Sequence, residues 1–298
     1  METRRLGRTG INVSVLGFGG SEIGAANASI ATVERILGGA LDAGLNLIDT
    51  AACYADSENL IGRAVSHRRR DFFLMTKCGH ASGLPYDDWT PALIEKSIER
   101  SLKRLRTGYI DVLQLHSCEL ETLGRDELID VIVRARERGH TRFLGYSGDG
   151  PAALAAIRSG IFDTLQISVN IADQEAIELV LPAARDADVG VIAKRPIANV
   201  AWRERWPMMD GYVRPYWRRL RKLRYPFLLR AHDAAVATAL RFTLSTLGVH
   251  TAIVGTSNPA RWAQNAALAA RGALPSDEYD AIRNRWRAIA SEDWIGQR

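Results

Sequence analysis

Short apolar runs alternate with longer amphipathic stretches along the whole chain. Eight runs have the length and residue types of strands, and most are nearly continuous in apolar residues, as in parallel strands covered on both faces. They are residues 13–19, 45–50, 72–77, 110–116, 141–147, 164–170, 189–196 and 251–256. The stretches between them show helical periodicity, and several end near glycine. Examples are 32–43, 91–105, 126–138, 151–158, 175–187 and 233–247.

Eight such units predict an α/β fold of the closed (β/α)8 type, a TIM barrel. The alternative is an open doubly wound sheet, which usually carries GxGxxG after its first strand. Gly17, Gly19, Gly20 and Gly24 do not have that spacing, and the sequence contains no Walker A loop. Because no low-complexity linker divides the chain, we expect residues 1–298 to form a single barrel domain.

A long segment without a clear pattern runs from Ile197 to about His232, after the seventh predicted strand, and exceeds the usual loop length. We expect this loop, 198–232, to fold over a functional site, with tryptophans lining a pocket. Basic and aromatic residues together also hold single-stranded nucleic acid. That role is less favoured, since the chain has no RRM, KH or OB signature. The basic and aromatic residues are Arg203, Arg205, Arg214, Arg218, Arg219, Arg221, Lys222, Arg224, Arg230, Trp202, Trp206, Tyr212, Tyr216, Trp217, Tyr225 and Phe227.

Composition narrows the class of protein without identifying it. With 47% hydrophobic and 24% charged residues, the 298-residue chain is neither disordered nor collagen-like. Charged residues interrupt every long apolar window, and the N-terminus leads into no apolar segment, so we expect a cytoplasmic protein without membrane spans. The formal net charge of +5 is compatible with a phosphorylated cofactor but does not require one. Oligomeric state cannot be inferred from the sequence.

Polar residues gather at the ends of the predicted strands, where a (β/α)8 enzyme places its reactive groups. Any one of them alone has an ordinary structural explanation, such as a helix cap or a solvated lysine, but their joint occurrence favours a function. The set is Asp49, Tyr54, Lys77, His116, Ser147, Gln166 and Asn170.

Four of these residues form a plausible proton-delivery device. A phenol is a poor acid at neutral pH, and a nearby ammonium lowers its pKa, so we expect Lys77 to lower the pKa of Tyr54. A lysine in a partly dry barrel mouth needs a carboxylate, and Asp49 lies on the adjacent strand. His116 could orient a substrate carbonyl. Such a set would protonate a carbonyl oxygen as hydride reaches its carbon, and nicotinamide is the usual hydride donor.

Several blocks of sequence have the order and spacing of motifs found in a known protein family. Residues 6–10 and 13–19 have the form of an opening β-hairpin and first strand. The run from Asn46 to Ala51 is followed by Tyr54, by Ser57-Glu58 and by Ile61-Gly62, and Lys77 and His116 follow at strand ends in the same order. Nearly the whole chain thereby resembles the aldo-keto reductase superfamily.

The resemblance implies a catalytic role for each member of the tetrad. Tyr54 is the general acid, Lys77 and Asp49 tune it, and His116 positions the carbonyl of an aldehyde or ketone, which is reduced to an alcohol. The reverse oxidation is open to the same site. Family members bind NADPH or NADH in an extended pose without a Rossmann fold, which agrees with the missing GxGxxG.

The resemblance also assigns residues to the nicotinamide end of the cofactor. Ser147 and Gln166 match positions that hold the carboxamide. The usual asparagine after the serine is Gly148, so one contact is either lost or supplied by Asn170. Lys194 occupies the position of an aromatic residue that stacks on the nicotinamide. Arg195 could lie flat against that ring or, with Lys194, reach the pyrophosphate.

An anion site is predicted near the end of the barrel. Asn258-Pro259 is a good helix start, and the preceding turn, Gly255, Thr256 and Ser257, presents hydroxyl and N–H groups at the positive helix terminus. An ordinary capped helix is the simpler alternative. The resemblance makes this segment the adenosine-phosphate block, with Arg261 on the 2′-phosphate and Asn265 on the adenine. We expect NADPH, with NADH also possible because many NADPH-dependent members have lysine in place of Gly255.

Three cysteines, Cys53, Cys78 and Cys118, lie near the tetrad in the sequence. With His80 and His116 they could form a soft-metal or redox-sensing site, but no familiar zinc spacing is present, and we expect no metal. Thiol-based inhibition remains open.

The alternative function is a catalytically weak NADPH-binding redox sensor or partner subunit, suggested by Lys194 and Gly148. The intact tetrad argues against it, because a pure binding module has no need of these four residues together.

Overall fold

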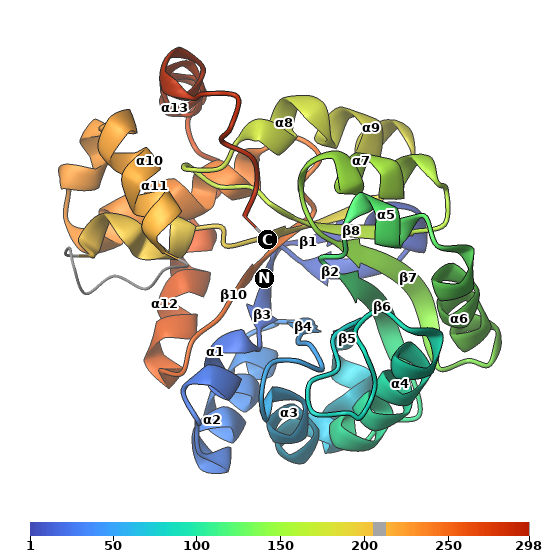
Figure 1. The fold of residues 1–298 in the computed structure, drawn as a ribbon. Coiled ribbons are helices and arrows are strands. Elements are labelled where there is room, and N and C mark those ends of the chain that lie inside the picture. The colour runs from blue at the N-terminus through green and yellow to red at the C-terminus, as the bar shows by residue number, and fades with distance from the viewer. Residues whose placement is uncertain (205–212, 298) are drawn as a thin grey trace.

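Eight parallel strands close into a barrel in the computed structural model, which describes residues 1–204 and 213–297. Around the barrel they follow in the order β10 (Thr251–Val254), β3 (Leu16–Gly19), β4 (Leu47–Asp49), β5 (Phe73–Cys78), β6 (Ile110–His116), β7 (Thr141–Ser147), β8 (Thr164–Ser168) and β9 (Gly190–Lys194). Figure 1 shows the helices arranged around the outside of this barrel. The predicted (β/α)8 fold is therefore confirmed.

The helices begin where the sequence supplies caps. Ser29, Thr90 and Asn258 each accept a backbone N–H bond at a helix start. Across the described parts of the chain, no helix has both the length and the apolar character needed to cross a membrane. The helices are α1 (Ser21–Ala25), α2 (Ile30–Asp42), α3 (Ser57–Val65), α4 (Pro91–Leu105), α5 (Leu120–Leu123), α6 (Asp126–Glu137), α7 (Gly150–Arg158), α8 (Glu175–Leu179), α9 (Leu181–Asp186), α10 (Arg214–Leu223), α11 (His232–Ser245), α12 (Pro259–Ala269) and α13 (Ser276–Ile289).

Two predicted elements are divided in the structure. The first predicted strand, 13–19, contributes to two sheets: β2 (Asn12–Ser14) pairs antiparallel with β1 (Thr3–Arg5) in the N-terminal hairpin, and the barrel strand β3 begins only at Leu16. The predicted helix 175–187 breaks into α8 and α9. Pro182 explains this break, because its ring cannot donate a backbone hydrogen bond and conflicts with the preceding helical turn.

The segment 197–232 is more regular than predicted. It contains α10 and two short 3-10 helices, η3 (Ala198–Arg203) and η4 (Pro226–Leu229). Tyr216, Leu220 and Leu223 are buried along one face of α10, so a narrow apolar stripe holds this otherwise basic helix to the protein. Arg205, Trp206 and Tyr212 lie outside the described residues.

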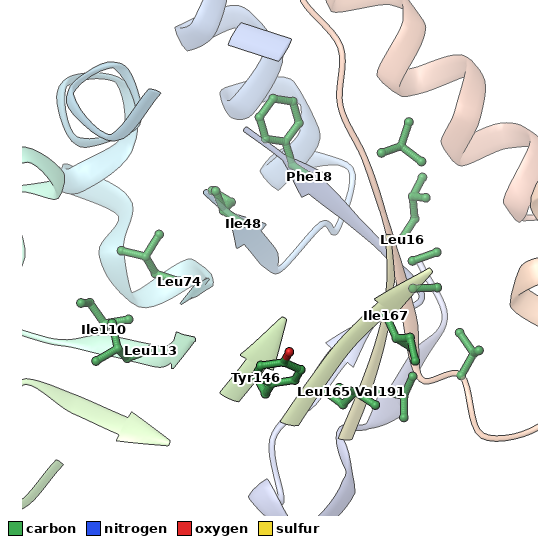
Figure 2. Close-up of a cluster of buried hydrophobic side chains, with 14 of the residues drawn as sticks. Leu16, Phe18, Ile48, Leu74, Ile110, Leu113, Tyr146, Leu165, Ile167 and Val191 are labelled. Carbon is green, nitrogen blue, oxygen red and sulfur yellow. The ribbon is translucent and has the colours of Figure 1, made fainter. Parts of the chain in front are cut away.

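Side chains alternate between the two faces of each barrel strand and build two apolar layers. The outward side chains pack against the helices, and Figure 2 shows part of this cluster, including Leu16, Leu74 and Ile167. The inward apolar side chains fill the barrel instead; they are Leu47, Met75, Val112 and Ile192, joined by Leu6, Ile11 and Val13 from the N-terminal hairpin region. Polar inward residues follow farther along the strands.

The hairpin region closes the amino-terminal end of the barrel. Leu6 is completely buried there. A Cβ atom on Gly190, at the start of β9, would lie only 2.7 Å from Leu6 Cγ, so the glycine makes room for the leucine. This apolar plug closes the amino-terminal end of the barrel to ligands.

We predict that Leu6→Ala lowers the free energy of unfolding by about 2–5 kcal/mol, because the small side chain leaves a cavity under the barrel. Urea denaturation followed by circular dichroism measures this change. The matched control is Leu120→Ala, since the Leu120 side chain is 52% exposed and its loss should change stability by about 0.5 kcal/mol or less. Equal effects of the two substitutions would show that Leu6 is not a structural plug.

Candidate active site

The open end of the barrel collects the polar side chains that the strands point inward. Asp49 is the last residue of β4, His116 of β6, Ser147 of β7 and Lys194 of β9. Lys77 is the penultimate residue of β5 and has the same inward parity. All of these except Lys77 are among the residues that line a cleft of about 780 Å³, a volume typical of small-molecule sites.

A buried ion pair lies at the base of this cleft. Lys77 Nζ is 2.6 Å from Asp49 Oδ2 and also donates to the carbonyl of Thr50 at 2.8 Å. Asp49 Oδ1 accepts from the side-chain amides of Gln114 and Gln166, each at 2.9 Å. Burial opposes the ammonium, but attraction to Asp49 outweighs it and raises the pKa of Lys77. The Lys77 ammonium is therefore retained inside the protein, and additional hydrogen bonds stabilise the pair.

Tyr54 lies over this pair, from the turn that follows β4. Lys77 Nζ is 5.0 Å from the centre of the Tyr54 ring. The expected lowering of the Tyr54 pKa is wrong in its net direction: burial raises the pKa by more than Lys77 lowers it. The sequence could show the neighbouring lysine but not how far the phenol is withdrawn from water. Tyr54 is consequently a neutral phenol at physiological pH.

His116 completes the group at the end of β6. Its ring meets the Tyr54 ring edge-on, with centroids 5.6 Å apart. Burial, aided by the positive charge of Lys77, lowers the pKa of His116 well below its ordinary value. The imidazole is therefore neutral, and it can donate one N–H bond without competing with Tyr54 as an acid. The structure thus brings together all four residues of the predicted tetrad.

The residues predicted to hold a carboxamide differ in their placement. Ser147 and Gln166 line the cleft, and Ser147 Oγ donates to Gln166 Oε1 at 3.2 Å. Asn170 is buried beyond the end of β8, and its Oδ1 accepts from the backbone N–H of Ala172 at 2.8 Å. Asn170 is not among the described residues that line the cleft, so the structure does not bring Asn170 to the site. The chain turns between Asn170 and Asp173, whose backbones pair, and the Asn170 side chain bonds within this turn.

Lys194 and Arg195 both line the cleft at the end of β9. Lys194 Nζ is 2.7 Å from Asp149 Oδ2, and burial lowers the pKa of this lysine despite the attraction of the carboxylate. Sequence reasoning missed Asp149. It precedes α7 in the position of a helix cap, but its Oδ1 instead accepts the backbone N–H of Ser168 at 2.7 Å.

The C-terminal segment also reaches the open end of the barrel, as Figure 1 shows. The Gln297 carbonyl accepts from Arg195 Nη1 at 2.5 Å, and the Gln297 N–H donates to Asp173 Oδ2 at 3.3 Å. A Cβ on Gly296 would lie 2.3 Å from Asp149 Oδ1, so this close approach requires glycine. The sequence could not predict these contacts. Backbone groups of the C-terminal segment make most of them, and any residue type carries such groups.

The residues of the predicted phosphate site line the same cleft as the tetrad residues Asp49, Tyr54 and His116. The residues that line it include Gly255, Thr256, Ser257, Asn258, Arg261 and Asn265. The Asn258 side chain accepts the backbone N–H of Ala260 at 3.0 Å, which confirms the predicted cap of α12. Sequence reasoning missed Glu22, whose Cγ would lie 2.8 Å from a Cβ on Gly255. Glu22 therefore occupies the space that a side chain at position 255 would need.

The expected tryptophan lining of the cleft is wrong for the described part of the segment 197–232. Val213 lines the cleft, whereas Trp202 packs against the core and Trp217 borders a separate surface hollow beside Trp294. The sequence showed aromatic content but not the direction of each side chain.

The three cysteines also separate. Cys78 and Cys118 belong to the outer apolar layer, where burial raises the pKa of each thiol to about 12. Only Cys53 contacts a tetrad residue, His116. In the part of the chain that the structure describes, no group of three or more His, Cys, Asp or Glu side chains could hold a metal ion.

Together, the closed barrel and the phenol, imidazole and Lys–Asp pair at its open end define the class of protein, an oxidoreductase. Over residues 15–287 the sequence matches the profile of the Aldo/keto reductase family. The chain therefore belongs to this family, whose members generally use nicotinamide cofactors and act on small carbonyl compounds.

Similar proteins agree with this assignment. L-galactose dehydrogenase of Arabidopsis thaliana is 30% identical, over 90% of this chain and 88% of its own length. D-threo-aldose 1-dehydrogenase of a Pseudomonas species is 28% identical, over 88% and 91%. Among solved structures, the holo form of aldo-keto reductase AKR11C1 from Bacillus halodurans is 27% identical and superposes with a TM-score of 0.84, over 99% of both chains.

We predict that Lys77→Met destabilises the protein by about 3–5 kcal/mol, because it leaves the buried Asp49 carboxylate without its counter-charge. Adding Asp49→Asn to this variant removes the orphaned charge and should restore much of the lost stability. Urea denaturation of both single variants and the double variant gives the coupling free energy. Additive effects, with no recovery in the double variant, would contradict a paired buried charge.

Proposed function

We propose that residues 1–298 act as one catalytic barrel domain that reduces an aldehyde or ketone to an alcohol with NADPH, using Tyr54 as the general acid. The observation that carries the proposal is the contact between Tyr54 and the buried Lys77–Asp49 pair, beside a neutral His116 in the same cleft. NADH is the second cofactor that the site could accept.

The residues of the cleft fit an extended dinucleotide. Ser147 and Gln166 offer a hydroxyl and an amide beside the tetrad, where a carboxamide would be held. In the same cleft, the turn 255–258 presents backbone N–H groups at the start of α12, and Arg261 adds a positive charge suited to a phosphate. Bound nicotinamide supplies the hydride in this chemistry.

Protein side chains supply the proton. The raised pKa keeps the Tyr54 hydroxyl protonated at neutral pH, as an acid must be. As that proton passes to the carbonyl oxygen, negative charge develops on the phenol oxygen, and the Lys77 ammonium stabilises it. Asp49 holds the ammonium in place, and His116 can donate a hydrogen bond to the same carbonyl oxygen. In the oxidation of an alcohol, Tyr54 takes the proton back.

We predict that Tyr54→Phe lowers kcat for carbonyl reduction by about 10²–10⁴-fold, because it removes the acid while preserving the ring over Lys77. NADPH oxidation is followed at 340 nm with aromatic, aliphatic and acidic carbonyls and with sugars, since two relatives are named for aldose substrates. The control is Tyr86→Phe, because Tyr86 is an exposed tyrosine.

Two results would overturn the assignment. Full activity of Tyr54→Phe would show that another group is the acid. Binding of NADPH by a wild-type protein that reduces no member of the panel would favour the alternative function, a catalytically weak redox sensor or partner subunit.

We predict that Arg261→Ala weakens NADPH binding about tenfold while changing the Kd of NADH by less than about threefold, because only NADPH carries the 2′-phosphate. Fluorescence titration measures both constants. Arg271→Ala is the control, since Arg271 is an exposed arginine just beyond the other end of α12. Equal weakening of both cofactors would remove Arg261 from the recognition of the 2′-phosphate.

A further inference from the structure

The His116 imidazole has a partner that is not among the residues lining the cleft. Cys53 Sγ lies 3.2 Å from His116 Nδ1, within hydrogen-bonding distance for sulfur. The chain turns at the end of β4, and this turn places Cys53 next to His116 and its neighbour Tyr54 over Lys77. His116 is among the residues that line the cleft, whereas Cys53 is not. The thiol therefore contacts the imidazole without itself lining the cleft.

The ring is also held on its faces and edges. Tyr54 meets it with an interplanar angle of 79°, and His80 meets it at 68° with centroids 5.4 Å apart. His80 is itself fixed, since its Nε2 lies 3.1 Å from the His116 carbonyl and its Nδ1 lies 2.8 Å from Asp88 Oδ2. These contacts fix the plane of the imidazole. They do not determine which ring nitrogen carries the proton. That tautomer depends on the group that contacts Nδ1, which is the Cys53 thiol.

The protonation states of the two partners limit that choice. Burial raises the pKa of the Cys53 thiol, so the sulfur carries its hydrogen at neutral pH. Burial lowers the pKa of His116, so the imidazole carries only one proton. A neutral imidazole has one donor nitrogen and one acceptor nitrogen, and its acceptor nitrogen is a better acceptor than a thiol sulfur. The favoured arrangement is S–H donating to Nδ1.

We propose that Cys53 is a positioning residue whose S–H group holds His116 in the tautomer with the proton on Nε2, so that this N–H is directed to the substrate carbonyl. The proposal rests on the proposed function, in which His116 binds that oxygen. It assigns a task to a cysteine that neither the proton transfer nor the apolar core uses. It also separates Cys53 from Cys78 and Cys118, which are packing residues of the outer layer.

The tautomer is measured directly by nitrogen-15 NMR of the protein labelled at histidine, without cofactor or substrate. His116→Gln identifies the two ring nitrogens by loss of their signals. We expect an unprotonated Nδ1 and a protonated Nε2 in the wild type and in Cys53→Ser, which keeps a donor. In Cys53→Ala we expect both tautomers to be populated. A proton on Nδ1 in the wild type, or an unchanged tautomer in Cys53→Ala, would overturn the proposal.

Kinetics provide the second measurement. Cys53→Ala should lower kcat/KM for the carbonyl about tenfold, the value of one hydrogen bond of ordinary strength, without changing the Kd of NADPH. Cys53→Ser should restore activity to within about threefold of the wild type. Cys118→Ala removes a thiol of the outer layer and should leave kcat/KM unchanged. Loss of activity in Cys53→Ser equal to that in Cys53→Ala would contradict a donor role.

The two proposals fail in different ways. If the wild-type protein reduces no carbonyl, or if Tyr54→Phe is fully active, the proposed function fails while the NMR result still decides the tautomer of His116. If Tyr54→Phe is inactive but the tautomer does not depend on Cys53, the proposed function stands and the role of Cys53 falls.

Discussion

The buried ion pair of Lys77 and Asp49 is the interaction on which the open end of the barrel depends. Two charges withdrawn from water are tolerated only when each is paired and its remaining hydrogen-bonding groups are satisfied. Here Asp49 also accepts from Gln114 and Gln166, and Lys77 also donates to Thr50. The network joins β4, β5, β6 and β8 at one level of the barrel. Its ammonium faces the Tyr54 ring. The same lysine therefore holds the strands together and places a positive charge beside the phenol.

Other parts of the fold enclose the layer of the ion pair from below and from above. Below it, the inward apolar side chains and the Leu6 plug fill the barrel, so the ion pair is closed off from water on that side. Above it, the C-terminal segment meets Asp149, Asp173 and Arg195 through close backbone contacts. One cleft contains both the tetrad residues Asp49, Tyr54 and His116 and the turn before α12.

The tetrad could be predicted because its evidence is local. Asp49 and Tyr54 lie five residues apart in the sequence, and Lys77 and His116 each end a recognisable apolar run. The cap of α12 was predictable for the same reason, since Asn258-Pro259 is a short-range signal. The helix break at Pro182 could have been predicted from the proline itself. The apolar residues on both sides of Pro182 favoured one continuous helix instead.

Other features depend on the three-dimensional arrangement and could not be inferred. The direction of the Tyr54 pKa shift reflects burial, which a list of neighbours does not reveal. Asp149 has the position of a helix cap, yet its carboxylate pairs with Lys194 from another strand. Glu22 fills the space beside Gly255 from a helix far away in the sequence. Asn170 follows a strand but does not line the cleft, because its side chain bonds within the turn that starts there.

The open end of the barrel holds a protonated phenol beside a buried, charged lysine. The most direct test is carbon-13 NMR of the protein labelled at tyrosine Cζ, with the Tyr54 signal followed from about pH 6 to about pH 10. We expect the chemical shift of a neutral phenol at neutral pH and the phenolate shift only above the ordinary pKa of a phenol, because burial raises the pKa of Tyr54. A change to the phenolate shift near neutral pH would contradict the account.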